Sequence, residues 1–554
     1  MKHLFRAVLI AAVIASSVGA APALAQTTTP VELRILAIND FHGYLQPPPG
    51  GIRIPDPNDK SKRIAVKAGG AEHMATLLKQ LRQGAKNTIF VAAGDLIGAS
   101  PFPSALFHDE PTIESLSMMG LEVASVGNHE FDEGKDELVR MQNGGCHPVD
   151  KCLGPHSFAG AKFRYLAAST IEKSTGKTMF PPYAIRQFEG IPVAFIGLTL
   201  KGTPKLVLPV GVADLEFKDE ADTVNALVPE LKARGVEAIV VLIHEGGFPT
   251  GDNNECPGIS GPIVDIVKKF DKAVDVVISG HTHQAYVCEI DGRLVTSGDK
   301  YGTLVTAIDV RLDPPTRDII SARADNVIVR TAVYARDPEQ TALIASYDKV
   351  AAPIANRPAG SITDTLSRSP NDAGESVLGD IVADAQLDAT RDEKDGDAVI
   401  AFTNPGGVRT DIAKKADGTV SYADVFASQP FRNQLVTLTG AQIKDALEQQ
   451  WLDPKRPRIL QVSKGFNYAW DGAKPYGERV LVDRMSLNGQ PIDPAKSYRV
   501  TVNNYLAVGG DGFTLLKEGT GQQFGIYDVD ALYGYFRANS PIAPTAPGRI
   551  ARMN

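Results

Sequence analysis

Five short polar clusters in the first half of the chain carry side chains that can bind divalent metal ions. They contain carboxylates, an asparagine amide and several imidazoles. A pair of metal ions uses such ligands, because oxygen and nitrogen donors bind the same metals and one carboxylate can bridge two ions. The clusters occupy residues 39–42, 94–95, 127–132, 244–247 and 280–283.

The spacing within two of the clusters favours a shared ion. In an extended segment, side chains at positions i and i+2 point to the same side. Asp40 and His42 have this spacing, and so do His281 and His283. One Gly-Asp or one Asp-x-His alone would be an ordinary turn or a chance match, but five clusters together indicate a common metal site.

Each cluster follows an apolar run that predicts a buried strand. The runs are 31–38, 88–93, 123–126, 237–243 and 274–279. Amphipathic patterns predict helices at 71–82, 219–234 and 262–270, and the Pro-rich segment 46–59 predicts a surface excursion. This alternation predicts an α/β domain in which the strand carboxyl ends meet at one crevice, so the clusters should face a common point.

A helical pattern over 337–356 and the sequence Arg357-Pro358-Ala359-Gly360 predict a connecting helix and a hinge. A second α/β unit is expected to follow. Its predicted helices are 376–390 and 441–449, and its predicted strands are 398–403 and 498–503. Two domains therefore fit better than four. The expected divisions are 26–336, 337–360 and 361–554.

Loops of the second unit carry candidate ligand contacts. Arg409 follows a Gly-Gly pair and could present its guanidinium to a phosphate or a carboxylate. Phe431 and Tyr505 lie in predicted loops, where two aromatic rings could sandwich a flat base. Considered singly, Phe431 would more often be a core residue and Arg409 a solvated surface group.

These motifs resemble a known family. Asp40-x-His42, Gly94-Asp95, 127–130, His244 and Gly280-His281-x-His283 resemble the motif set of the calcineurin-like metallophosphoesterases, and 39–43 and 127–132 resemble the secreted bacterial 5'-nucleotidase family. The resemblance extends over nearly the whole chain. It implies an α/β protein with a four-layer α/β/β/α metallophosphoesterase domain, joined by a linker helix to a smaller α/β C-terminal domain that selects the substrate.

The resemblance also implies roles for individual residues. One metal would be held by Asp40, His42, Asp95 and His283. The other would be held by Asp95, Asn128, His244 and His281, with Asp95 bridging. The cofactors would be two divalent ions, with zinc, manganese, cobalt and iron left open. A metal-activated water would attack phosphorus in line, with His129 as the catalytic histidine and Asp132 orienting it.

In the second domain the resemblance implies a nucleotide site. Asn404 and Arg409 match polar substrate contacts, Phe431 and Tyr505 match the aromatic pair that clamps the base, and Asp511 matches a residue near the ribose. Tyr505 replaces the more familiar Phe and keeps the stacking face.

Two departures from the family pattern bear on the phosphate ester. An Arg common before the helix at Ser376 is missing from 371–376, where Arg368 could substitute, and Ser169 stands where Asn is common. The resemblance as a whole predicts a 5'-nucleotidase that removes phosphate from nucleotides. A 2',3'-cyclic-nucleotide 2'-phosphodiesterase/3'-nucleotidase and a nucleotide-sugar diphosphate hydrolase remain alternatives.

Two further classes are disfavoured. The aromatic pair argues against a sulfur-ester hydrolase of the same superfamily. A degenerate periplasmic nucleotide-binding protein would be expected to lose ligands, whereas all seven metal positions and the pair His129 and Asp132 are present.

The amino terminus predicts a signal peptide at 1–25. Lys2 and Arg6 precede the apolar run 7–18, and Ala23-Leu24-Ala25 has the small-x-small pattern that a signal peptidase reads. The run is shorter than the roughly 20 residues of a membrane span. We therefore expect a secreted protein, located in the periplasm, without a membrane anchor.

The net charge of the chain bears on its possible partners. The chain has 57 basic and 65 acidic residues, a formal net charge of −8, which becomes −10 without the two cations of 1–25. An acidic surface argues against a nucleic-acid polymer or an anionic membrane as partner, leaves a small-molecule nucleotide, and gives no sign of an obligate protein partner.

The four cysteines predict two disulfides in an oxidising compartment. Three connectivities are possible, and we prefer the nearer neighbours, Cys146 with Cys152 and Cys256 with Cys288. A four-cysteine zinc site is disfavoured because the sequence contains no Cys-x-x-Cys pair.

Overall fold

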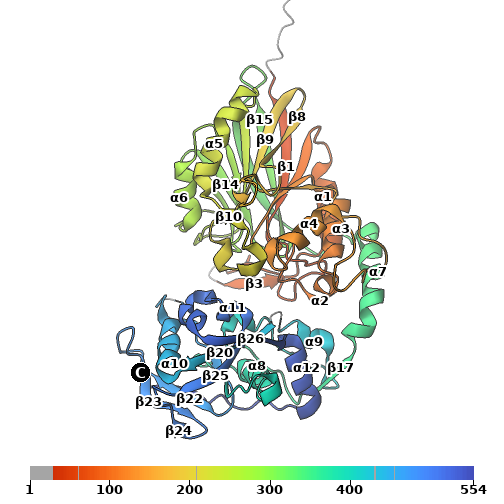
Figure 1. Ribbon diagram of the computed structural model, residues 1–554. Helices are drawn as coiled ribbons and strands as arrows, with labels where there is room; N and C mark the ends of the chain where they lie inside the picture. Colours follow the sequence, from red (N-terminus) through yellow and green to blue (C-terminus); the bar gives the residue numbers. More distant parts are fainter. Residues whose placement is uncertain (1–28, 60–61, 208, 430–431, 455) are drawn as a thin grey trace, which may run out of the picture.

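The computed structural model describes residues 29–554 except 60–61, 208, 430–431 and 455. The predicted signal peptide at 1–25 therefore lies outside the described residues. The chain forms two lobes, which the long helix α7 (Pro338–Ala355) joins along one side (Figure 1). In the described part of the chain, no helix is long and apolar enough to cross a membrane.

The first lobe contains two six-stranded sheets. The first has the order β16 (Ile319–Ile328), β15 (Leu304–Leu312), β1 (Val31–Ile38), β4 (Thr88–Ala93), β5 (Val123–Ser125) and β6 (Arg164–Leu166). The second has the order β13 (Ala285–Ile290), β14 (Arg293–Gly298), β12 (Val276–Ile278), β11 (Ala238–His244), β9 (Ile191–Thr199) and β8 (Tyr183–Phe188). The strands β1, β4, β5 and β6 are parallel to one another, and so are β9, β11, β12 and β14.

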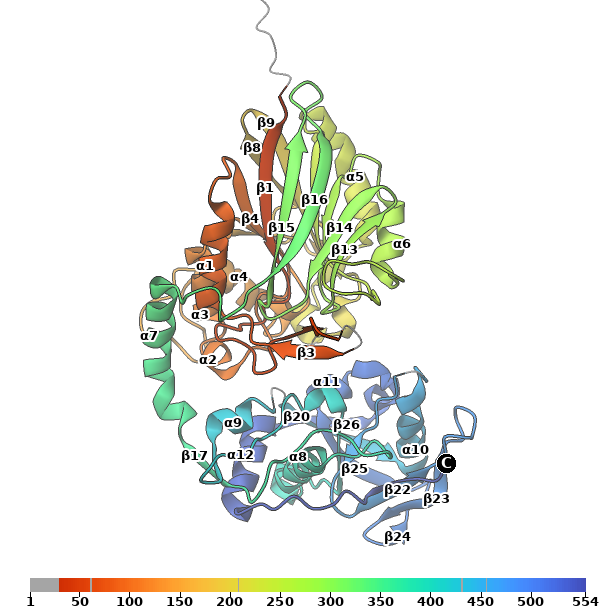
Figure 2. The same ribbon diagram turned by 180° about the vertical axis from the view of Figure 1, so that it is seen from behind.

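The two sheets face each other across one apolar core that contains Ile35, Val91, Phe195 and Val240. Helices cover the outer face of each sheet, as Figures 1 and 2 show from opposite sides. Over the first sheet lie α1 (Ala71–Arg82), α3 (Glu110–Met118) and α4 (Lys135–Asn143); over the second lie α5 (Glu220–Ala233) and α6 (Pro262–Lys269). The expected four-layer α/β/β/α arrangement is confirmed. It explains the continuous apolar runs, since these strands are buried on both faces.

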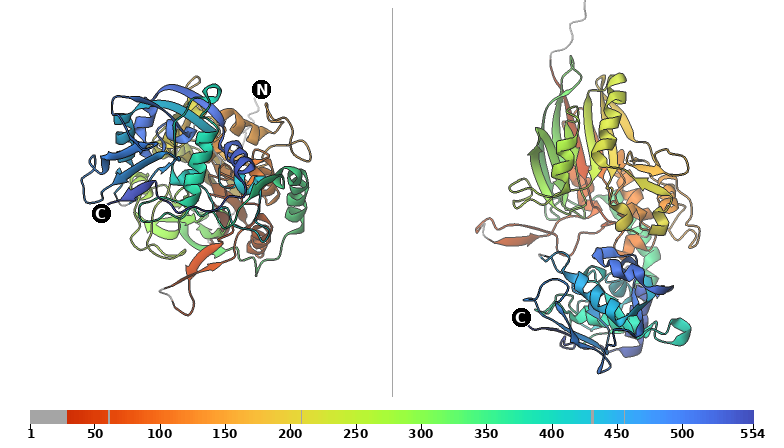
Figure 3. Two further views of the ribbon diagram at one scale, coloured as in Figure 1. Left: turned by 90° about the horizontal axis from the view of Figure 1, so that it is seen from below. Right: turned by 60° about the vertical axis from the view of Figure 1, so that its left-hand side comes forward.

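The Pro-rich segment 46–59 leads into a hairpin of β2 (Ile52–Pro55) and β3 (Arg63–Val66). This hairpin projects from the first lobe (Figure 3, right). The predicted surface excursion is therefore partly regular structure. Its pairing was not predicted, because the short strands carry prolines and charges at their ends.

The second lobe is also α/β. Its five-stranded sheet has the order β21 (Gln461–Val462), β18 (Ile400–Thr403), β25 (Ser497–Asn503), β20 (Arg432–Thr439) and β26 (Thr520–Tyr527). A four-stranded sheet has the order β24 (Gln490–Pro491), β23 (Val480–Leu487), β22 (Phe466–Trp470) and β27 (Ile550–Arg552). The helices α8 (Val377–Asp388) and α12 (Asp528–Asn539) share one core, and α10 (Gly440–Glu448) packs in another with both sheets.

Helix α7 starts where the sequence predicted it. The Asp337 carboxylate accepts hydrogen bonds from the amides of Glu339 and Gln340, which caps the helix. Its buried Tyr347 packs with residues of α2 (Phe102–Ala105), and α9 (Tyr422–Phe426) of the second lobe contacts the same cluster. The Arg456 guanidinium lies 5.0 Å from the centre of the Phe248 ring, a further contact between the lobes.

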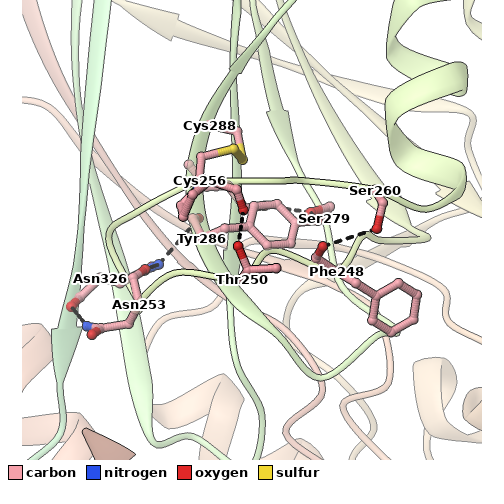
Figure 4. Close-up of a disulfide and its surroundings, with 11 residues drawn as sticks. Phe248, Thr250, Asn253, Cys256, Ser260, Ser279, Tyr286, Cys288 and Asn326 are labelled. Carbon is pink, nitrogen blue, oxygen red and sulfur yellow. Dashed lines mark hydrogen bonds between the residues drawn. A yellow bond between two sulfur atoms is a disulfide. The ribbon is translucent and has the colours of Figure 1, made fainter. Parts of the chain in front are cut away.

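Both preferred cysteine pairs are bonded in the structure, Cys146 to Cys152 and Cys256 to Cys288. Figure 4 shows the second disulfide, which joins the loop after β11 to strand β13. Asn253 and Asn326 hydrogen-bond to each other's backbone carbonyl oxygens at the base of this loop. The loop that carries Phe248 is thus held at two points.

Candidate metal centre

The five polar clusters lie at the carboxyl ends of parallel strands, as predicted. Those after β1, β4 and β5 come from the first sheet, and those after β11 and β12 come from the second. Since the two sheets stack face to face, the ligands approach from both sides of one crevice. This edge of the first lobe faces the second lobe (Figure 1).

Asp40, His42 and His283 form the first set of candidate ligands. Their ligand atoms all lie within 4.8 Å of one another. The Nε2 atoms of His42 and His283 are 3.1 Å apart, and His283 Nε2 is 3.4 Å from Asp40 Oδ1. Two imidazole nitrogens and a carboxylate oxygen at this spacing can surround one ion.

Asp95 lies between this set and a second one. Its Oδ2 is 2.9 Å from His244 Nε2 and 3.7 Å from His42 Nε2. The ligand atoms of Asp95, His244 and His281 also lie within 4.8 Å of one another. Asp95 is therefore the carboxylate placed to bridge two ions. His281 and His283 belong to different sets, and the shared ion that their spacing predicted is wrong, because both residues have a left-handed and not an extended backbone.

Backbone carbonyl oxygens orient two of the imidazoles. His42 Nδ1 is 2.9 Å from the Gly98 oxygen, and His244 Nδ1 is 2.8 Å from the Ala93 oxygen. A carbonyl only accepts, so each Nδ1 carries the proton and each Nε2 is left for a metal. Burial lowers the pKa of His42 to about 3 and that of His281 to about 4, which keeps both in the neutral, metal-binding form.

Two buried atoms at the centre fit metal ligands. Among the described residues, Asn128 Oδ1 is buried and makes no hydrogen bond, and the buried His244 Nε2 has only the Asp95 carboxylate, at 2.9 Å, as a polar neighbour. An unsatisfied buried polar atom costs about 1–3 kcal/mol. Divalent ions at this centre would satisfy both atoms, and the mixed oxygen and nitrogen donors suit zinc, manganese, cobalt or iron.

The backbone at the centre is strained. Five of the candidate ligands are non-glycine residues in the left-handed region: Asp40 (φ 49°), His42 (48°), Asp95 (49°), His281 (68°) and His283 (54°). Such conformations cost of order 1–3 kcal/mol each and persist at functional sites when the surrounding structure holds them.

His129 and Asp132 lie beside the first ligand set. His129 Nδ1 is 2.8 Å from Asp132 Oδ2, and the His129 amide donates to Asp95 Oδ1 at 2.8 Å. Burial lowers the pKa of His129, but the Asp132 and Asp95 carboxylates outweigh it and raise the pKa to about 9. These two carboxylates favour the protonated imidazole, in which Nε2 is left to donate.

Glu130 is a functional residue that sequence reasoning did not single out. Its buried carboxylate accepts hydrogen bonds from the amides of Asp95 (2.9 Å), Leu96 (2.8 Å) and Gly127 (2.7 Å). It thereby ties the loop after β4 to the loop after β5. Its position inside the 127–132 motif is the only sequence signal for this role.

Gly98 is a second position that was missed. Its φ is +81°, and a Cβ there would lie 2.4 Å from the His129 oxygen and 2.8 Å from Asp132 Oδ2. The His42 ring also bonds to its carbonyl. Only glycine allows this close approach between the two loops.

Three of the predicted substrate contacts form one cluster in the second lobe. Asp511 accepts hydrogen bonds from Asn404 Nδ2 (2.6 Å) and from the Tyr505 hydroxyl (3.2 Å). Arg458, which was not predicted, donates to the Asp511 carbonyl at 2.9 Å. Phe431 lies outside the described residues.

Arg409 reaches toward the first lobe. Burial raises the pKa of Tyr44 and of Tyr301, and the positive charge of Arg409 opposes this rise. The same charge lowers the pKa of His129. The rings of Tyr44 and Tyr301 stack with centroids 4.0 Å apart. The Tyr301 ring also lies 5.7 Å from the His283 ring. These two tyrosines were not predicted, because their approach to Arg409 depends on the docking of the lobes.

Arg368 and Ser169, which were named where the sequence departs from the family pattern, both contact the backbone. Arg368 Nη1 donates to the carbonyl oxygens of Val408 (2.9 Å) and Arg409, so this side chain supports the Arg409 loop. The Ser169 hydroxyl is buried and bonds to the backbone of Thr199, which links the turn at Ser169 to the end of β9.

Comparison with known proteins gives the family. A family model for calcineurin-like phosphoesterase matches residues 33–285, and one for the 5'-nucleotidase C-terminal domain matches residues 354–518. The chain is 34% identical to an endonuclease, YhcR, of Bacillus subtilis (strain 168) over 525 residues. That match covers 94% of this chain but 41% of the endonuclease, so the chain spans less than half of that relative.

Two further comparisons extend over the whole length of both proteins. A 5'-nucleotidase of Vibrio cholerae serotype O1 is 25% identical over 591 residues, which covers 97% of each chain. The crystal structure of a 5'-nucleotidase precursor from Thermus thermophilus has the same two-domain fold, with a TM-score of 0.72, 24% identity, and coverage of 94% of this chain and 99% of that one. The chain belongs to the 5'-nucleotidase family, with a calcineurin-like phosphoesterase domain followed by a 5'-nucleotidase C-terminal domain.

Proposed function

We propose that this protein is a two-metal phosphohydrolase that removes phosphate from nucleotides, with 5'-nucleotides as its substrates. One observation carries the proposal: two sets of ligands share Asp95 and lie beside the His129 and Asp132 pair. Its family relatives include proteins named 5'-nucleotidase, which supports the same chemistry.

The ligands would divide between two ions. Asp40, His42, Asp95 and His283 would hold one, and Asp95, Asn128, His244 and His281 the other. When bound, the ions would supply positive charge for the phosphate oxygens and would lower the pKa of a water molecule that attacks phosphorus.

The residues of the chain position and protonate the substrate. The Asp132 and Asp95 carboxylates raise the pKa of His129 and favour its protonated form, whose Nε2 would donate to a phosphate oxygen or to the leaving oxygen. Asp132 fixes the ring through Nδ1, and the Asp95 carboxylate fixes the His129 backbone. The imidazole is thus preorganised to stabilise charge that develops in the transition state.

The second lobe would select the nucleotide. Tyr505, with Phe431, would stack on the base, Asn404 and Asp511 would contact polar groups of the sugar, and Arg409 would pair with phosphate. Arg409 is near enough to His129 for its charge to lower the pKa of that imidazole, which supports a substrate held between the lobes.

A cyclic-nucleotide phosphodiesterase/3'-nucleotidase or a nucleotide-sugar diphosphate hydrolase is the second candidate. The segment 371–376 contains no Arg, and the Asn371 side chain instead accepts hydrogen bonds from the amides of Ala373 and Glu375. A phosphate-side cation is thereby missing at this point.

The two disulfides and the predicted signal peptide support a secreted, periplasmic protein.

A substrate panel with defined metals tests the proposal. We expect AMP with a 5'-phosphate to give a higher kcat/KM than 3'-AMP, 2',3'-cyclic AMP or a nucleotide-sugar diphosphate. His129→Ala should lower kcat by at least about 100-fold, the range of general acid catalysis. His156→Ala is the control, because His156 is exposed and pairs with Glu114. A His129→Ala variant as active as the wild type would refute the mechanism, and a preference for the cyclic or diphosphate substrate would select the second candidate.

A further inference from the structure

A second group of histidines and carboxylates lies outside the metal centre. His108 lies between α2 and α3, Glu133 follows Asp132, and His147 and Asp150 belong to the loop after α4. We call these four residues, His108, Glu133, His147 and Asp150, the outer histidine cluster. The His108 and His147 rings stack with centroids 3.8 Å apart and an interplanar angle of 16°.

The donor atoms of the cluster have the spacing of a metal site. His108 Nε2 is 3.1 Å from Asp150 Oδ2, and His147 Nδ1 is 3.5 Å from the same oxygen. His108, His147 and Asp150 can present ligand atoms that all lie within 4.8 Å of one another. Around tetrahedral zinc, with metal–ligand distances near 2.0–2.2 Å, neighbouring ligand atoms are about 3.3 Å apart.

Glu133 is placed to orient the His108 ring. Its Oε2 is 2.8 Å from His108 Nδ1, on the side of the ring opposite to Asp150. A carboxylate that holds one imidazole nitrogen fixes the ring and leaves the other nitrogen for a metal. Glu137, the other nearby carboxylate, is occupied by Arg140 at 2.7–3.0 Å.

The loop that carries two of the ligands is shaped in advance. The disulfide Cys146–Cys152 brackets His147 and Asp150, and the Lys151 amide donates to the His147 carbonyl at 3.0 Å. The Asp150 amide donates to His147 Nδ1 at 3.0 Å. An ion bound at that nitrogen would replace this bond and would turn the His147 ring out of its stack on His108, because an imidazole nitrogen donates through a lone pair in the plane of its ring. The two imidazoles are largely buried, with 13% and 14% of their side chains exposed, whereas the carboxylates face solvent.

We propose that the outer histidine cluster binds one divalent cation of the zinc class, separate from the ions of the metal centre. His108 Nε2, the His147 imidazole and the Asp150 carboxylate are the ligands, and Glu133 orients His108. Three protein ligands leave one position open to solvent. The ion cross-links the loop 146–152 to the segment between α2 and α3 that carries His108, and Glu133, next to Asp132, holds that imidazole. The ion thereby stiffens the outer wall beside the His129 and Asp132 pair.

Metal stoichiometry of the full-length protein tests this site. After saturation with zinc and removal of free metal, elemental analysis should give one equivalent less for His147→Ala and for Asp150→Asn than for the wild type. His156→Ala, the matched control, should lose none, because that imidazole has one carboxylate partner and no second histidine. The test uses a difference of one equivalent, so it is independent of the number of ions held at the metal centre.

A second measurement separates this site from the proposed function. In an Asp95→Ala background, which removes the carboxylate proposed to hold both ions of the metal centre, cobalt(II) should still bind at the outer histidine cluster and give the visible absorption of a histidine-coordinated ion. Adding His147→Ala should abolish that absorption. If His147→Ala and Asp150→Asn retain the wild-type stoichiometry, or if His156→Ala loses an equivalent as well, the cluster is a hydrogen-bonded ion pair and the proposal is wrong.

Discussion

Glu130 joins two metal-binding loops, and its replacement by Gln tests how far the ligands depend on that link. The carboxylate accepts three amide hydrogen bonds: Oε2 from Asp95 and Gly127, and Oε1 from Leu96. Gln has one acceptor oxygen. In its better orientation, that oxygen keeps the first two bonds, and the NH2 group faces the Leu96 amide, which is left without an acceptor.

The expected magnitude follows from this count. One unsatisfied buried donor costs about 1–3 kcal/mol, so the free energy of unfolding of the metal-free protein should fall by that amount. The loops that carry Asp95 and Asn128 lose part of their support. Loss of such a supporting partner lowers metal affinity by about 10–100-fold. Urea unfolding measures the first effect, and competition with a chromophoric zinc chelator measures the second.

Glu375 provides a matched control in the second lobe. Its fully buried carboxylate also accepts three amide bonds, from Gly548 (3.0 Å), Arg549 (2.8 Å) and Ile550 (3.1 Å). Glu375→Gln should therefore lose similar stability but keep the wild-type zinc affinity. The reasoning is refuted if Glu130→Gln binds zinc as tightly as the wild type, or if both variants weaken zinc binding equally.

Gly98, Asp275 and the disulfide between Cys256 and Cys288 each provide a further test. Gly98→Ala places a Cβ 2.4 Å from the His129 oxygen, so kcat should fall while the second-lobe substrate contacts are unchanged; an unchanged kcat in a phosphate-release assay would contradict this. Burial raises the pKa of Asp275 from 3.8 to about 8, so the folded state holds a proton that the unfolded state releases, and stability falls as pH rises through this range. Asp275→Asn should flatten this slope and be more stable than the wild type at pH 9, which urea titrations at pH 5 and pH 9 would check. Replacing Cys256 and Cys288 by Ser should lower the free energy of unfolding by about 3–4 kcal/mol, as expected for a closed loop of this length; equal urea midpoints would exclude it.

The sequence predicted best where one local pattern determines the structure. β1, β4 and α1 have the predicted bounds, because β4 is an apolar run, β1 ends in one, and α1 has a clear amphipathic period. The ligand clusters were found for the same reason, since they follow such strands. β16 was not predicted, because most of its side chains are half exposed or exposed and give a weak pattern.

Features that depend on distant segments could not be predicted. The left-handed conformation of Asp40 and His283 is imposed by the packed loops and not by residue type. The role of Glu130 arises from amides 34 and 35 residues away in the chain. The approach of Arg409 to Tyr301 requires the lobes to be docked through α7, which no local pattern specifies.

The disulfide between Cys256 and Cys288 closes a covalent ring of chain that contains α6, β12 and the His281-x-His283 pair. Pro257 and Gly258, just inside the ring, are exposed. A protease that cut there would leave two fragments still joined through sulfur, with metal ligands on both. The nicked protein would migrate as one species until a reductant is added, so integrity on a non-reducing gel says nothing about whether this loop is intact.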